Sequence, residues 1–181
     1  RAGSSGFFAV NGGQVNVNGA TTPDLNIGKT SATGVMTVNN NAQVAVNRYL
    51  YVGRDGTSTG TLTLNDTAQV TVNSNIYIGN VTTSSGTLTV NNSASLTCAT
   101  LMIWNGAGTV NVNGGTVPAT SWSTVGQSVG GTATLNHNAG DVITPEVYTT
   151  FQATGTYNLS GGTLSTARFT KNSGTGILNF N

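Results

Sequence analysis

The chain has 181 residues and only 6% of them are charged, so the polar surface of the folded protein must come from threonine, serine and asparagine. A net charge of +1 gives no field that would attract nucleic acid or an anionic membrane, and a chain with 36% hydrophobic residues and so little charge does not have the composition of a disordered protein. No run approaches the roughly 18 apolar residues of a membrane helix, and the single cysteine excludes an intrachain disulfide framework. We therefore expect one folded domain over residues 1–181, with no membrane insertion and no nucleic-acid partner.

After a polar lead-in over residues 1–5, a repeat runs to the end of the chain. Each unit opens with a glycine, the second and fourth residues after it are apolar, and the fifth is asparagine in every unit but one, which has Ser160. Apolar residues at alternate positions predict a half-buried strand, so each unit begins with a strand and 176–181 forms a terminal one. The openings are Gly6, Gly34, Gly60, Gly86, Gly108, Gly131, Gly155 and Gly176.

We interpret the repeated glycine and asparagine as structural. Glycine tolerates positive φ, so we expect Gly34, Gly60 and Gly86 to let the chain turn into each strand. Asparagine tolerates the left-handed region too, and stacked asparagines can pair along the axis of a solenoid. The sequence therefore predicts a structural ladder, in preference to a ligand-binding row, through Asn11, Asn39, Asn65, Asn91, Asn113 and Asn136.

Two further strand patterns follow in each unit, for example at Val44 with Val46 in the second. In the two later units where the third strand is hardest to place, we assign it to Val147 and Phe169. Three strands recurring at a fixed spacing indicate stacked coils, not a sandwich. The predicted fold is an all-β, three-sided parallel β-helix, or β-solenoid, of about seven coils. Coil lengths that vary from 21 to 28 residues favour the right-handed form.

The residues at 78–79 and 86–91 repeat those at 52–53 and 60–65 one coil earlier, as Ile/Val-Gly and then Gly-Thr-Leu-Thr-Val/Leu-Asn. This pattern resembles the repeats of autotransporter passenger domains and of PEP-CTERM-type exported bacterial proteins. The resemblance implies an exported bacterial β-solenoid, extracellular or at the cell surface. It implies no particular activity.

Residue types that carry catalysis or bind metals are few and scattered. His137 follows Asn136 and is expected at a surface turn, whereas Cys98 falls in an inward column and is expected to act as a small core residue. Hydrolysis of polysaccharides needs a pair of carboxylates close together, but here the carboxylates fall on different faces in the coil register. Calcium-binding repeats need glycine–aspartate nonapeptides, which do not recur in this sequence. We expect no enzymatic activity, no cofactor and no metal. The carboxylates are Asp24, Asp55, Asp66, Asp141 and Glu146.

Two surface patterns suggest other functions. The outward side of the first strand carries Thr-x-Thr, as in Thr61 with Thr63 and Thr87 with Thr89, and this is similar to the ice-binding surface of several antifreeze proteins. Threonine is also simply a good residue for a solvated strand. Aromatic residues such as Trp104 lie near the third strands, where exposed rings could contact a glycan or another surface.

Both ends of the predicted stack present apolar strands with no helix, proline or charged run to cover them. We therefore favour a non-enzymatic extracellular structural protein whose subunits assemble head to tail into a filament. Because the chain begins at Arg1 rather than Met, we expect a processed or excised form. With no evident tag or tail beside the uncapped ends, we favour a complete subunit that is ordered by its neighbours. The alternative is a stalk or passenger fragment of a surface adhesin. The predicted interface consists of Phe7, Phe8 and Val10 at one end and Ile177, Leu178 and Phe180 at the other.

Overall fold

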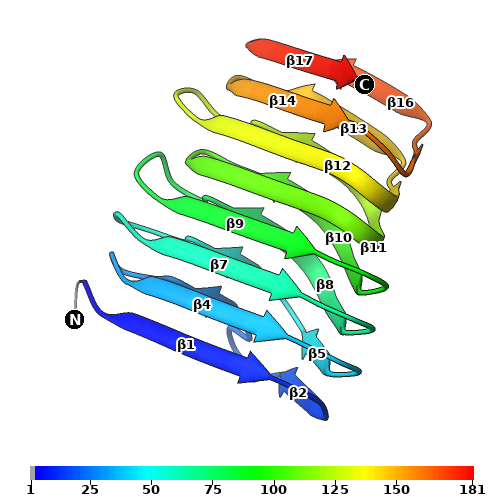
Figure 1. Ribbon diagram of the computed structural model, residues 1–181. Coiled ribbons are helices and arrows are strands. Elements are labelled where there is room, and N and C mark those ends of the chain that lie inside the picture. The colour runs from blue at the N-terminus through cyan, green and yellow to red at the C-terminus, as the bar shows by residue number, and fades with distance from the viewer. Residues whose placement is uncertain (1–2) are drawn as a thin grey trace.

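Three parallel stacks of strands wind around one axis and form the solenoid shown in Figure 1. The computed structural model describes residues 3–181, and within that range every regular element is a β-strand. In Figure 1 the chain runs from left to right along the front strands, returns behind them and rises with each coil, so the winding is right-handed. We call the three stacks sheets 1, 2 and 3, in the order in which each coil contributes to them. The predicted all-β parallel solenoid of about seven coils is confirmed.

Sheet 1 contains the first strand of every coil, paired in parallel from one end of the stack to the other. Its first strand begins at Ser5, so the lead-in is shorter than predicted, and residues 1–2 of that lead-in lie outside the described range. The strands are β1 (Ser5–Val10), β4 (Thr33–Val38), β7 (Thr59–Leu64), β9 (Ser85–Val90), the first parts of β11 (Ala107–Val125) and β12 (Thr132–Ile143), β14 (Thr154–Leu159) and β17 (Thr175–Phe180).

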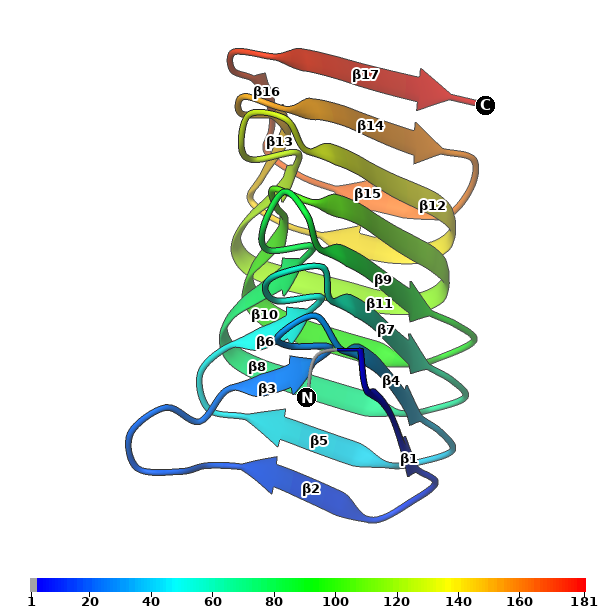
Figure 2. The ribbon, with the colours of Figure 1, turned by 90° about the vertical axis from the view of Figure 1, so that its left-hand side faces the viewer.

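Sheets 2 and 3 complete each coil, as the view in Figure 2 shows. Sheet 2 contains β2 (Gln14–Val17), β5 (Gln43–Val46), the first parts of β8 (Gln69–Ile78) and β10 (Ser95–Ile103), the middle of β11, the end of β12 and β15 (Thr163–Ser165). Sheet 3 contains β3 (Leu25–Ile27), β6 (Leu50–Val52), the ends of β8, β10 and β11, then β13 (Glu146–Thr150) and β16 (Arg168–Lys171). Val147 pairs with Ser123 and with Phe169, so both assignments of the third strand are confirmed.

The core is a set of inward columns that run along the axis. In the central coils the second and fourth residues after the opening glycine are buried, as at Leu62, Leu64, Leu88 and Val90, so the predicted alternation is confirmed there. Complete burial of a leucine side chain stabilises the fold by about 1.5–3 kcal/mol. Phe8 continues the same column at the first coil but is 51% exposed, because no further coil covers it.

The opening glycines are needed for close approach and not for a turn, so the predicted reason for them is wrong. Positive φ occurs instead at the glycines that close sheet 3, such as Gly53 with a φ of 73°. A Cβ at Gly60 would lie 2.2 Å from the backbone nitrogen of Gly53 and 2.3 Å from the carbonyl oxygen of Ile27. Sheet 1 therefore packs backbone to backbone against the corner that ends sheet 3, and a side chain there would push the two apart.

The coil predicted to open at Gly131 has a different register. Gly108 pairs with Ala133 and Val112 pairs with His137, so the opening position falls two residues later than predicted. Ala133 is 3% exposed and takes the place that glycine has in the other coils. Asn136 consequently lies opposite Asn111 and not opposite Asn113, which corrects its predicted place in the ladder.

Candidate functional surfaces

A ladder of asparagine amides follows the corner where sheet 1 ends. Each asparagine donates from Nδ2 to the Oδ1 of the asparagine one coil earlier, so every member in the middle both donates and accepts. The bonds join Asn39 to Asn11 (2.6 Å), Asn65 to Asn39 (2.7 Å), Asn91 to Asn65 (2.8 Å), Asn113 to Asn91 (3.0 Å) and Asn138 to Asn113 (2.8 Å).

A second ladder, which the sequence reasoning missed, stands two residues away on the outward face of sheet 1. Asn136 donates to Asn111 at 2.9 Å, Asn158 to Asn136 at 2.8 Å and Asn179 to Asn158 at 2.7 Å. The signal for both ladders was present as Asn-Val-Asn at 111–113 followed by Asn-His-Asn at 136–138. Aligning these two triplets, instead of the preceding glycines, gives the observed register.

The outward face of sheet 1 presents three residues from each strand, and we call these positions the sheet 1 face. None of them is charged, and threonine predominates. The columns are Ser5, Thr33, Thr59, Ser85, Ala107, Thr132, Thr154 and Thr175; then Phe7, Val35, Thr61, Thr87, Thr109, Thr134, Thr156 and Ile177; then Ala9, Thr37, Thr63, Thr89 and the four asparagines of the second ladder.

His137 is fully buried in an inward column, so its predicted place at a surface turn is wrong. Its Nε2 lies 3.0 Å from the carbonyl oxygen of Gly140, which can only accept, so Nε2 carries the proton. Nδ1 then accepts from the hydroxyl of Tyr157 at 3.1 Å. Burial raises the pKa of Tyr157 above its ordinary value and keeps that hydroxyl protonated. Both ring nitrogens are thus used in holding the core together.

The carboxylates are engaged in contacts that fix loops and edges. Asp24 lies 3.5 Å from Arg54 and 3.3 Å from Nε of Arg48, the latter at ion-pair distance but outside hydrogen-bond geometry. Asp66, with a φ of 61°, accepts from the backbone of Asn40 at 3.1 Å and from the side chain of Asn92 at 3.3 Å. These carboxylates cross-link neighbouring coils on different sides of the solenoid.

Two further carboxylates make contacts of the same kind. Asp55 accepts from the backbone nitrogen of Thr30 in the neighbouring coil. Glu146 accepts from the hydroxyl of Thr170 and, at 2.7 Å, from Arg168. The hydrogen bond from Thr170, followed by weaker contributions from Tyr148 and Arg168, lowers the pKa of Glu146 despite its partial burial.

Cys98 is 2% exposed in the inward column of sheet 2, as predicted for a core residue. Burial raises the pKa of its thiol to about 12, so it is protonated and unreactive at neutral pH. Across residues 3–181 no three His, Cys, Asp or Glu side chains lie close enough together to hold a metal ion. In the same range no helix has the length and apolarity needed to cross a membrane.

An aromatic cluster covers the outward side of sheet 3. Tyr51 stacks on Tyr77 with ring centroids 5.0 Å apart, and Tyr77 meets Trp104 edge to face at 5.4 Å. The guanidinium of Arg54 lies 4.4 Å from the ring centroid of Tyr51, whose pKa burial raises. Because these rings pack on one another, they form a second, small core outside the coil. Glycan contact at this cluster stays a prediction.

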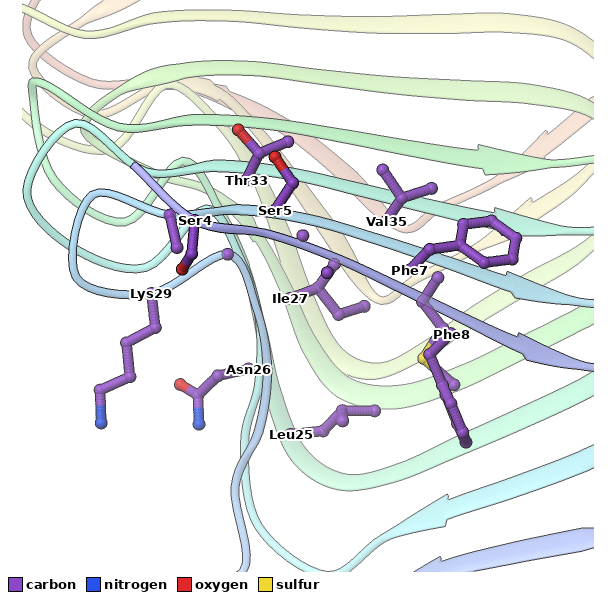
Figure 3. Close-up of a pocket in the computed structure, with 15 residues that line it drawn as sticks. Ser4, Ser5, Phe7, Phe8, Leu25, Asn26, Ile27, Lys29, Thr33 and Val35 are labelled. Carbon is purple, nitrogen blue, oxygen red and sulfur yellow. The ribbon is translucent and has the colours of Figure 1, made fainter. Parts of the chain in front are cut away.

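The two ends of the solenoid are open. At the end formed by β1 and β3, a groove of about 400 Å³ lies between the two strands, and Figure 3 shows Phe8, Leu25 and Ile27 around its mouth. At the other end, β17 is the eighth strand of sheet 1, whereas β15 and β16 are the seventh strands of their sheets. Sheet 1 therefore extends one strand beyond the others, as Figure 1 shows.

The fold defines the chain as a β-solenoid of stacked parallel coils. No family model, no curated protein and no solved structure matches it. The structure has the β-solenoid fold that the resemblance to exported bacterial repeats implied. The comparisons give no support to the assignment to autotransporter passenger domains or PEP-CTERM-type proteins.

Proposed function

We propose that this protein is a non-enzymatic structural subunit that assembles end to end through its open coils. The observation that carries the proposal is the distribution of exposed large apolar side chains. Phe7 and Phe8 lie at one end, and Phe169, Ile177, Leu178 and Phe180 lie at the other, with exposures of 37–70%. Only Val129 and Ile143 are comparably exposed along the sides of the described chain.

The proposed joint adds β1 of one copy to β17 of the next as a further parallel strand of sheet 1. In the register that all earlier coils use, Gly6 would face Gly176, Phe8 would face Leu178 and Val10 would face Phe180. The edge of β17 would gain backbone hydrogen bonds, and the inward side chains of Phe8 and Phe180 would be covered by the next strand. Because the contact joins two different ends, it does not close on itself and produces a filament.

The engagement of the carboxylates supports a structural over a catalytic role. Asp24, Asp55, Asp66 and Glu146 each bond to a neighbouring coil. With the residue pattern that resembles exported bacterial repeats, this favours a protein that works outside the cell or at its surface.

The test is the size of the particles formed by residues 1–181. Sedimentation velocity and electron microscopy over a range of concentrations should show linear polymers. Phe180→Asp should leave monomers, because a carboxylate would be buried without a partner in the joint. Val129→Asp, which places the same charge on an exposed apolar residue at the side, should polymerise normally. A monodisperse wild-type monomer at high concentration, or equal loss in both variants, would overturn the proposal.

A second candidate is a stalk or passenger segment of a surface adhesin. The repeated residue pattern at 52–65 and 78–91, which resembles the repeats of exported bacterial proteins, favours it. A parent reading frame that continues through more repeats to a membrane anchor would support this candidate. A stop codon directly after residue 181 would exclude it.

A further inference from the structure

The sheet 1 face is more regular than the fold requires. The outward residues of sheet 2 also lie on strands that face solvent, yet they are of mixed types. They include Gln43, Ala45, Pro118, Asp141 and Ile143. Sheet 3 is covered by the aromatic cluster. The predominance of threonine and asparagine on one side of three is therefore a property of that side and not of the solenoid as a whole.

From this difference we infer that the sheet 1 face binds ice. Parallel strands place its side chains on a two-dimensional lattice, about 4.8 Å apart between coils and about 6.6 Å apart along each strand. Threonine supplies a hydroxyl that can donate and accept, beside a methyl group. In the described part of the chain, the hydroxyls of Thr61, Thr63, Thr87 and Thr89 make no hydrogen bond to the protein, so they are available to water.

The second asparagine ladder orders one column of this lattice in the later coils. Asn111, Asn136, Asn158 and Asn179 each have the amide fixed by the next member, at 2.7–2.9 Å. Amides held in place by one another present their remaining donors and acceptors in a repeating order. A preordered surface loses little conformational entropy when it meets an ordered ligand.

The chemistry of the face favours crystalline water over other partners. With no lysine or arginine in its columns, it lacks the groups that attract nucleic acid and anionic lipid. Aromatic residues and arginine, which are enriched in protein interfaces, are absent from its central coils. An uncharged lattice rich in hydrogen-bonding groups suits the surface of a crystal made of neutral hydrogen-bonding molecules.

The experiment measures thermal hysteresis and inhibition of ice recrystallisation. Thr63→Lys places a long charged side chain in the middle of the face, and Thr71→Lys makes the same change on the exposed outer side of sheet 2 in the same coil. Melting curves of both variants establish that they fold. Wild type and Thr71→Lys should shape ice crystals, and Thr63→Lys should lose the activity severalfold.

Two results would overturn the inference. One is wild-type protein that leaves ice growth unchanged, whether or not Thr63→Lys then abolishes lateral self-association or retention on crystalline cellulose. The other is equal loss of the activity on ice in both variants. Measurements on Phe180→Asp as well as on wild type separate this inference from end-to-end assembly.

Discussion

Replacing Gly60 by alanine tests the close approach of sheet 1 to the end of sheet 3. The new Cβ would lie 2.2 Å from the nitrogen of Gly53 and 2.3 Å from the carbonyl oxygen of Ile27, and both are backbone atoms of earlier coils. Overpacking a core costs about 1–3 kcal/mol when side chains can yield, and occasionally more. Because backbone cannot rotate aside, we expect the loss to reach about 3 kcal/mol. In a chain of this size that corresponds to a fall in Tm of roughly 6–12 °C.

The same column supplies its own controls. Gly6 occupies the equivalent place in the first coil, where an added Cβ meets no atom within 4 Å, so Gly6→Ala should be neutral or stabilise by up to about 1 kcal/mol. At Gly108 the nearest atom is a methyl group of Ile103 at 2.3 Å, so Gly108→Ala should fall between the two. Thermal melts of the three variants provide the comparison. A Gly60→Ala protein that melts like Gly6→Ala would refute the argument that backbone contact selects these glycines.

Three further predictions concern the inward columns and the end of the stack. Leu88→Asp should lower the free energy of unfolding by several kcal/mol because it buries an unpaired charge. Thr89→Asp on the outward face should lower it by only about half a kcal/mol. If thermal melts show the opposite order, Leu88 does not point inward. Cys98 should react with a thiol reagent only as fast as the coils open, because its side chain is buried. The control is the double variant Thr97→Cys, Cys98→Val, whose cysteine points outward. If Cys98 in wild type is labelled faster than this control, its burial is contradicted. The folded protein lowers the pKa of Glu146, so the ionised carboxylate stabilises the fold fully above its ordinary pKa of 4.5. This stabilisation is lost as the pH falls through the lowered pKa of the folded state. Glu146→Gln should therefore lose less Tm than wild type over that acidic range.

The inward columns could be predicted because strand geometry maps directly onto sequence. Alternate side chains point to opposite faces, so the pairs after each glycine in the central coils identify the core without any knowledge of the coil's path. The third strands at Val147 and Phe169 are harder to place, because few alternating apolar residues mark them, although the pairing confirms both positions. An error in one coil does not propagate, because each coil contacts only its neighbours.

The register of the coil containing Ala133 could not be taken from its glycine. A glycine is required only where backbones meet, and Ala133 shows that one coil fills the position with a methyl group. Gly131 therefore marked the wrong place, and His137 was assigned to the surface instead of the core. The asparagine triplets would have served better, because a ladder bond needs its partner in the same register one coil away.

The open ends and the repetitive side face have one physical origin. A solenoid satisfies the backbone of each strand with the strand before it and the strand after it, so its terminal strands always carry unpaired groups. The same repetition projects any outward residue that recurs once per coil into a row along the axis. Sheet 1 holds both consequences together, because β1 and β17 are its edges and the sheet 1 face is its outer side. If copies join through those edges, the sheet 1 faces of successive copies lie in line, and their total area grows with the length of the filament. At each joint Ile177, Phe7 and Ala9 interrupt the columns of threonine and asparagine. Filaments should therefore inhibit ice recrystallisation more strongly per mole of chain than Phe180→Asp monomers, and equal activity per mole would show that the face does not act across the joint.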